Sequence, residues 1–128
     1  MNNDIFDYNQ AQNGTAQEVC EILHANIAAA LPNANAKLYH ANPVWFIDDN
    51  PVVGYDVLGD HVNLLFWSGQ SFTEPGLTAA GKFKAAGTKY LSVSDVDVSQ
   101  LQSWLRESLK VQWNYRDLRA NNGDLIRL

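Results

Sequence analysis

The sequence predicts a single α+β domain in which two helices flank an antiparallel sheet of about five strands. Three short apolar runs between Pro43 and Trp67 are separated by compact turn sequences, a spacing typical of an antiparallel meander. Two longer segments, one before the meander and one after it, repeat apolar residues with the period of an α-helix. We therefore expect a two-layer fold with both helices on one face of the sheet.

The first predicted helix runs from Thr15 to about Leu31. Thr15 and Glu18 have the spacing of a capping box, in which each side chain bonds a first-turn amide of the other. Apolar residues recur on one side of the helix, which predicts that this side packs on the sheet. Pro32 ends the helix. Residues 1–14 are rich in asparagine and glutamine without periodicity, so we expect an N-terminal tail there.

Five strands are predicted after the first helix. A short strand at Lys37–His40 precedes the three strands of the meander, and a final strand covers Lys89–Val93. Between the meander and the final strand lies a segment, residues 68–87, whose glycines and Pro75 interrupt regular structure. We expect a short helix near residues 78–86. Irregular segments of this length usually cover or gate another part of the molecule.

The second predicted helix follows the last strand, with Ser94 or Ser99 as its cap. Apolar residues at i, i+3 and i+4 spacing extend from Val98 to Trp113 and provide one packing face. We expect the helix to end by residue 120. The predicted domain, residues 15–120, is then followed by a C-terminal tail to residue 128.

The second face of the predicted sheet is too apolar to be left in water. Two helices cover one face, but successive strand residues are apolar on both faces. We expect the other face to be closed by the 68–87 segment, by a second copy of the chain, or by a ligand. The candidate pocket residues beneath that segment are Trp45, Tyr55, His61, Asn63, Trp67 and Tyr90. The alternative is that these side chains fill a second small core.

Composition restricts the class of protein. The chain has 128 residues, 46% of them hydrophobic, which is enough for one domain with its own core. A single cysteine, Cys20, excludes an internal disulfide framework, and no leader sequence or membrane-spanning run is apparent, so we expect a cytoplasmic protein. The net charge is −5, and the first 60 residues contain eight acids and one base. This acidic half argues against nucleic acid as the main partner and permits a cation or a basic partner instead. We expect no membrane partner.

Catalytic motifs are weak in this chain. The run Ser68–Ser71 follows a strand but lacks the flanks of a nucleophile elbow, and no phosphate-binding glycine pattern occurs. Cys20 lies on the apolar side of the first helix, where a thiol behaves as a small hydrophobic group. We therefore expect a protein without enzymatic activity. Glu21 and His24, three residues apart on the same helix, are candidate ligands for a loosely bound divalent ion.

Four segments combine aromatic and turn residues in a distinctive order: His40–Phe46, Asn50–Tyr55, Val62–Phe72 and Glu74–Leu77. Together they resemble the YdhG-like family, a widespread bacterial domain family of unknown function, over residues 15–118. The resemblance implies a frataxin-like fold. One branch of the family is described as an iron chaperone, which implies weak binding of Fe(II) by Glu18, Glu21 and His24 and its delivery to an iron-accepting protein. The alternative function is a module that binds a small molecule, or forms a homodimer, through the second sheet face.

Overall fold

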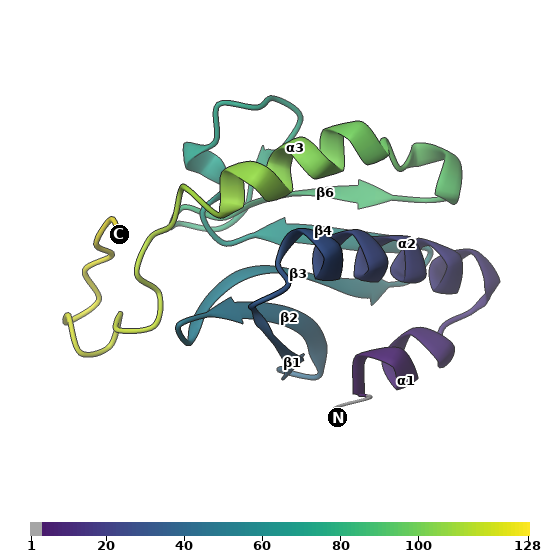
Figure 1. Ribbon diagram of the computed structural model, residues 1–128, viewed down its shortest axis with the longest axis horizontal. Helices are drawn as coiled ribbons and strands as arrows, with labels where there is room; N and C mark the ends of the chain where they lie inside the picture. Colours follow the sequence, from purple (N-terminus) through teal and green to yellow (C-terminus); the bar gives the residue numbers. More distant parts are fainter. Residues whose placement is uncertain (1–3) are drawn as a thin grey trace.

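The computed structural model describes residues 4–128 and has a six-stranded antiparallel sheet at its centre (Figure 1). The order of the strands in the sheet is β1-β2-β3-β4-β6-β5. The first four strands are consecutive in the chain: β1 (Asn35–Tyr39), β2 (Asn42–Ile47), β3 (Asn50–Leu58) and β4 (His61–Phe66). The other edge consists of β6 (Ala86–Tyr90) and the two-residue β5 (Thr78–Ala79). The predicted meander is therefore the main part of the sheet.

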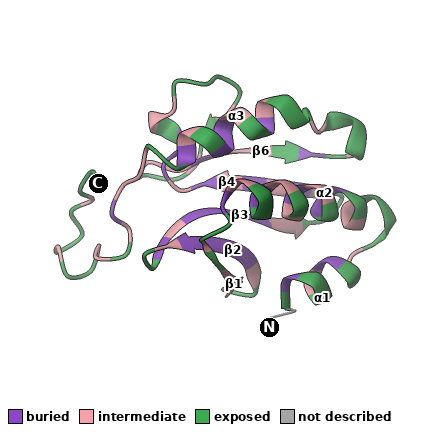
Figure 2. Cartoon of the chain, in the orientation of Figure 1, coloured by how far each residue is buried: buried purple, intermediate pink, exposed green. Residues whose placement is uncertain are grey.

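Three α-helices lie on one face of this sheet: α1 (Asp4–Gln10), α2 (Gly14–Ala30) and α3 (Val98–Ser108). Alternate residues of β3 and β4, such as Tyr55 and Leu64, form one core with the buried sides of α2 and α3. The outer sides of these helices are exposed (Figure 2). The predicted α+β arrangement is confirmed. Within residues 4–128, no helix has both the length and the apolar character needed to cross a membrane.

The sheet and the N-terminal region differ from the sequence prediction. The sheet has six strands rather than about five, because Thr78–Ala79 pairs with β6 where a short helix was expected. The predicted tail contains helix α1, whose Ile5 and Asn9 are buried against the rest of the molecule. A seven-residue helix has too few apolar positions to show a clear period. Residues 1–3 of the predicted tail lie outside the described residues.

The start of α2 also differs from the prediction. Its N-cap residue is Asn13, and no side chain caps the helix. Because the helix begins at Gly14, Thr15 is already inside the first turn, and the predicted capping box with Glu18 does not form. The helix ends at Ala30, one residue before the predicted end.

Helix α3 is shorter than predicted. Its cap is Asp97, whose side chain accepts a hydrogen bond from a first-turn amide, rather than Ser94 or Ser99. The helix ends at Ser108, and Trp113 lies in the irregular C-terminal segment that follows. The apolar stripe therefore overestimated the helix, because Trp113 packs against other parts of the chain through its own contacts.

Two-residue turns connect the first four strands. His40 and Ala41 have φ angles of 50° and 69°, and Asp48 and Asp49 have 50° and 64°. Positive φ at both central residues is the type I′ geometry, whose twist matches that of a hairpin. In the third turn, between β3 and β4, Gly59 has a positive φ angle of 60°. Left-handed backbone costs roughly 1 kcal/mol at a residue other than glycine, so Ala41 stores strain.

Candidate functional site

The face of the sheet opposite the helices carries a cavity of about 610 Å³. It opens to solvent and extends from the β1–β2 turn, at Tyr39 and His40, across β3, β4 and β6 to residues 78–80. Pockets for small organic molecules typically measure about 300–1,000 Å³. The cavity on this open face is therefore large enough for a metabolite-sized ligand.

One row of residues across the sheet forms the floor of the cavity. In register from β2 to β6, this row is Val44, Gly54, Leu65 and Gly87. A Cβ atom at Gly54 would meet the carbonyl oxygen of Pro43, and one at Gly87 would meet that of Leu64, closer than side chains approach backbone. Glycine inside a strand marks places where a ligand or another backbone comes close. The floor therefore has no side chain on either side of Leu65, and the backbone of β3 and β6 is accessible there.

A second row, two residues further along the strands, is polar. Asp56, Asn63 and Lys89 are paired in register on β3, β4 and β6, and all three line the cavity. In the described part of the chain, none of these three side chains forms a hydrogen bond or an ion pair with another protein group. Asp56 and Lys89 are two strands apart, about 10 Å at the backbone. One carboxylate and one ammonium group thus face the cavity without partners.

Two of the six predicted pocket residues line this cavity and have their side chains on the open face of the sheet. Asn63 lies in the polar row, and Trp67 follows β4 and lines the cavity while half-buried. His61 begins β4 on the same face but lies outside the cavity lining, and its Nδ1 is 3.3 Å from Oδ1 of Asp60. Of these three predicted pocket residues, Asn63 and Trp67 therefore line the cavity, and His61 does not.

The other three predicted pocket residues, Trp45, Tyr55 and Tyr90, belong to the helix-side core. Trp45 packs edge-on against the ring of His24, with centroids 5.7 Å apart. Tyr55 borders the cavity, but its hydroxyl donates to Oδ1 of Asn9 at 2.7 Å, and burial raises its pKa. Burial also raises the pKa of Tyr90, to about 12. These side chains join the sheet to the helices, because alternate strand residues point to opposite faces.

The 68–87 segment, one of the three expected covers of the open face, packs mainly against α3. Nε1 of Trp104 donates to the carbonyl oxygen of Pro75 at 3.0 Å. The amides of Thr73 and Glu74 donate to the carboxylate of Glu107 at 2.9 and 2.7 Å. Of this segment, residues 78–80 at β5 and Gly87 on β6 line the cavity. The segment therefore does not close the open face.

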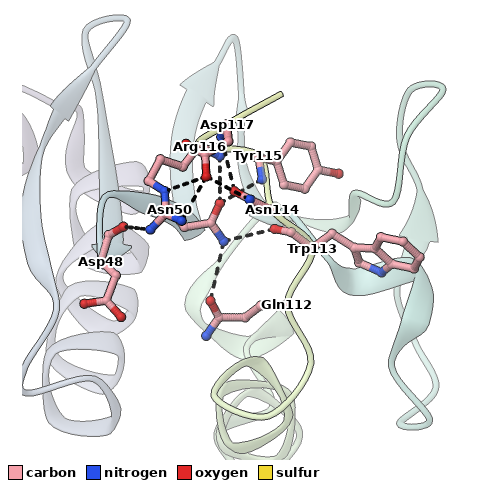
Figure 3. Close-up of polar contacts among 8 residues, drawn as sticks. All are labelled: Asp48, Asn50, Gln112, Trp113, Asn114, Tyr115, Arg116 and Asp117. Atoms are coloured by element: carbon pink, nitrogen blue, oxygen red, sulfur yellow. Dashed lines mark hydrogen bonds and ion pairs between the residues drawn. The ribbon is translucent and has the colours of Figure 1, made fainter. Parts of the chain in front are cut away.

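The buried side chain of Asn50 makes four hydrogen bonds to the irregular C-terminal segment (Figure 3), and the buried Ser68 accepts another from the amide of Trp113 at 2.9 Å. Its Oδ1 accepts hydrogen bonds from the amides of Tyr115 and Arg116, at 2.8 and 3.0 Å. Its Nδ2 donates to the carbonyl oxygen of Trp113 at 3.0 Å and to Oε1 of Gln112 at 3.4 Å. The side-chain amide thus uses both donors and both acceptor sites. No residue of this segment lines the cavity on the open face.

The candidate metal ligands do not converge. Glu18 and Glu21 are exposed on α2, whereas His24 is half-buried and its Nδ1 accepts from Nδ2 of Asn9 at 3.1 Å. Burial lowers the pKa of His24. Among residues 4–128, no three His, Cys, Asp or Glu side chains lie close enough together to hold a metal ion. Iron binding by Glu18, Glu21 and His24 stays a prediction.

Nucleophilic groups are not activated in the described structure. Cys20 is fully buried, and burial raises the pKa of its thiol to about 12, so the thiol is neutral at physiological pH. The side-chain hydrogen bonds of histidines within residues 4–128 go to Asn9 and Asp60, not to a serine, threonine or cysteine. Within residues 4–128, no histidine is therefore hydrogen-bonded to a side chain that could act as a nucleophile.

Sequence reasoning missed most of the open-face site. Two positions separate Gly54 from Asp56 on β3, and the same spacing separates Gly87 from Lys89 on β6. Residues two positions apart in a strand point to the same face of the sheet. That alternation was readable from the sequence. The register between β3, β4 and β6 was not, because β6 is separated from β4 by a long irregular segment.

Comparison of the chain with family models, curated proteins and solved structures found no match. No relative therefore indicates a ligand, a partner or a reaction. The function has to be argued from the chemistry and geometry of the open face.

Proposed function

We propose that this protein is a binding module without enzymatic activity, whose small-molecule ligand occupies the cavity on the open face of the sheet. The observation that carries the proposal is the floor of that cavity. Leu65 stands between two strand glycines that leave the backbone bare within a space of about 610 Å³. Bare backbone in the middle of a sheet lets a flat molecule approach closely.

The lining indicates a flat, mostly apolar ligand. Trp67 lies beyond Leu65 along the chain, and Tyr39 lies at the β1 end of the polar row, so aromatic rings stand at two corners of the cavity. Aromatic side chains contribute large contact areas and prefer stacked or edge-on partners. The charged groups of the cavity are in the row that contains Asn63, and Thr78 adds a hydroxyl group at the β5 end of the floor row, so a few polar groups can orient a ligand.

The proposal includes three expectations from the sequence: a cytoplasmic location, membership of the YdhG-like family and a frataxin-like fold. A frataxin-like fold has its helices on one face of the sheet. The helix-covered core and the uncovered opposite face support this fold. In this proposal the uncovered face, rather than the acidic side of α2, is the functional surface.

The test uses 1-anilinonaphthalene-8-sulfonate, a flat apolar probe whose fluorescence rises when it leaves water. Titration of the folded protein should give a saturable increase with one probe per chain. Leu65→Arg places a charged side chain on the cavity floor and should reduce this binding at least about tenfold, since an unpaired charge facing an apolar ligand is costly.

The matched control is Leu91→Arg, because Leu91 is exposed and outside the cavity lining. This variant should bind the probe as the wild type does, and circular dichroism should show both variants folded. Equal losses in the two variants, or no saturable binding to the wild type, would overturn the proposal.

A further inference from the structure

The cavity on the open face has a floor but no roof. Small-molecule sites usually bury 70–90% of the surface of their ligand, and a single sheet face covers only one side of a flat molecule. The 68–87 segment is held against α3, and the C-terminal segment is held by Asn50 outside the cavity lining. Neither segment closes the cavity, so within residues 4–128 the side of the cavity opposite its floor is open to solvent.

The two rows of the open face are symmetric about β4. In the floor row, Gly54 on β3 and Gly87 on β6 stand on either side of Leu65. In the polar row, the carboxylate of Asp56 and the ammonium group of Lys89 stand on either side of Asn63 on the same two strands. The two charges are opposite and equally distant from β4 in strand order.

We propose that a second copy of this chain covers the open face, related to the first by a twofold axis parallel to β4. Such an axis lies between two sheets that pack face to face about 10 Å apart. It places β3 of one copy over β6 of the other, because these strands are the two neighbours of β4. The inference deepens the proposed function, and rests on it, since both concern the same face.

This arrangement is complementary in charge and in shape. Asp56 of each copy faces Lys89 of the other, which gives two ion pairs from groups that lack partners within residues 4–128. Leu65 of one copy meets Leu65 of the other. Gly54 of one copy lies over Gly87 of the other, so a hollow remains on each side of the central leucines. The second copy thus provides the missing roof and leaves room for the ligand.

The size of the face indicates a weak dimer. The five longer strands, about 4.8 Å apart and about 20 Å long, give a face of roughly 480 Å² per copy, or about 1,000 Å² for both. Specific interfaces begin at about this size. We therefore expect an association that depends on protein concentration within the range accessible to sedimentation experiments.

The test is sedimentation velocity over a range of protein concentrations, with no ligand or probe added. Wild type should pass from monomer to dimer. Asp56→Lys and Lys89→Asp should each weaken the dimer at least about tenfold, because each replaces two attractions by two repulsions. Glu18→Lys, on the exposed side of α2, is the matched control and should leave the dimer unchanged.

Charge exchange makes the test specific for the twofold arrangement. The double variant Asp56→Lys/Lys89→Asp should recover the dimer, and so should an equimolar mixture of the two single variants. A wild-type monomer at every concentration would overturn the inference, as would equal effects of the Glu18→Lys control or failure of the exchange. Such a result, together with probe binding that is lost in Leu65→Arg, would leave the proposed function in place.

Discussion

Replacement of Asn50 by alanine should loosen the attachment of the C-terminal segment to the body of the protein. The change removes a hydrogen-bond partner from three backbone groups: the amides of Tyr115 and Arg116 and the carbonyl oxygen of Trp113. The amide of Arg116 is left unpaired, whereas the amide of Tyr115 still donates to the carbonyl oxygen of Trp113 at 3.0 Å. An unpaired buried polar group costs about 1–3 kcal/mol and a lost hydrogen bond about 0.5–1.5 kcal/mol, and we take the low end of each range because this segment is partly exposed. The expected loss is about 2 kcal/mol of unfolding free energy.

For a domain of this length, a loss of that size lowers the melting temperature by roughly 7 °C. Thermal unfolding followed by circular dichroism measures this shift, and limited trypsin digestion at Arg116 and Arg119 shows whether the segment is released in the folded state. Asn33→Ala, at an exposed turn asparagine, is the control and should change the melting temperature little. A shift of less than about 2 °C, with no new cleavage, would refute the argument from unpaired groups.

Three further predictions concern other parts of the chain. Burial holds the pKa of His24 below its usual 6.5, so the unfolded chain binds the proton more readily than the folded protein does. The free energy of unfolding should therefore fall as pH decreases through 6.5, and it should fall less in His24→Gln. Urea unfolding at each pH measures both. Equal pH dependence in both proteins would contradict this. Ala41→Gly should raise the unfolding free energy by about 1 kcal/mol, because glycine adopts the left-handed conformation of this turn without strain. An unchanged or lower value in the same assay would show that the turn is not strained at Ala41. The resemblance to the YdhG-like family predicts that Glu18→Ala/Glu21→Ala binds less Fe(II) than wild type in anaerobic calorimetry, and equal binding would remove these carboxylates from the iron hypothesis.

The placement of the candidate site shows the limit of strand patterns. Asn63 and Trp67 were identified from the sequence because they lie in the meander next to apolar residues, and both line the cavity. Trp45 and Tyr55 have the same local pattern but point to the helices. In a strand that is apolar on both faces, alternation separates two sets of residues without showing which set meets the helices.

The sequence by itself determined the local elements of this protein. The period of the apolar residues specified α2, and compact turns between apolar runs specified the hairpins, because these depend on neighbours within a few positions. Tertiary structure alone decided the rest. Asn50 bonds residues more than sixty positions away, Trp104 bonds Pro75 across the 68–87 segment, and β6 pairs with β4 to complete the open face. Contacts between distant residues depend on how whole elements pack, and no local pattern encodes them.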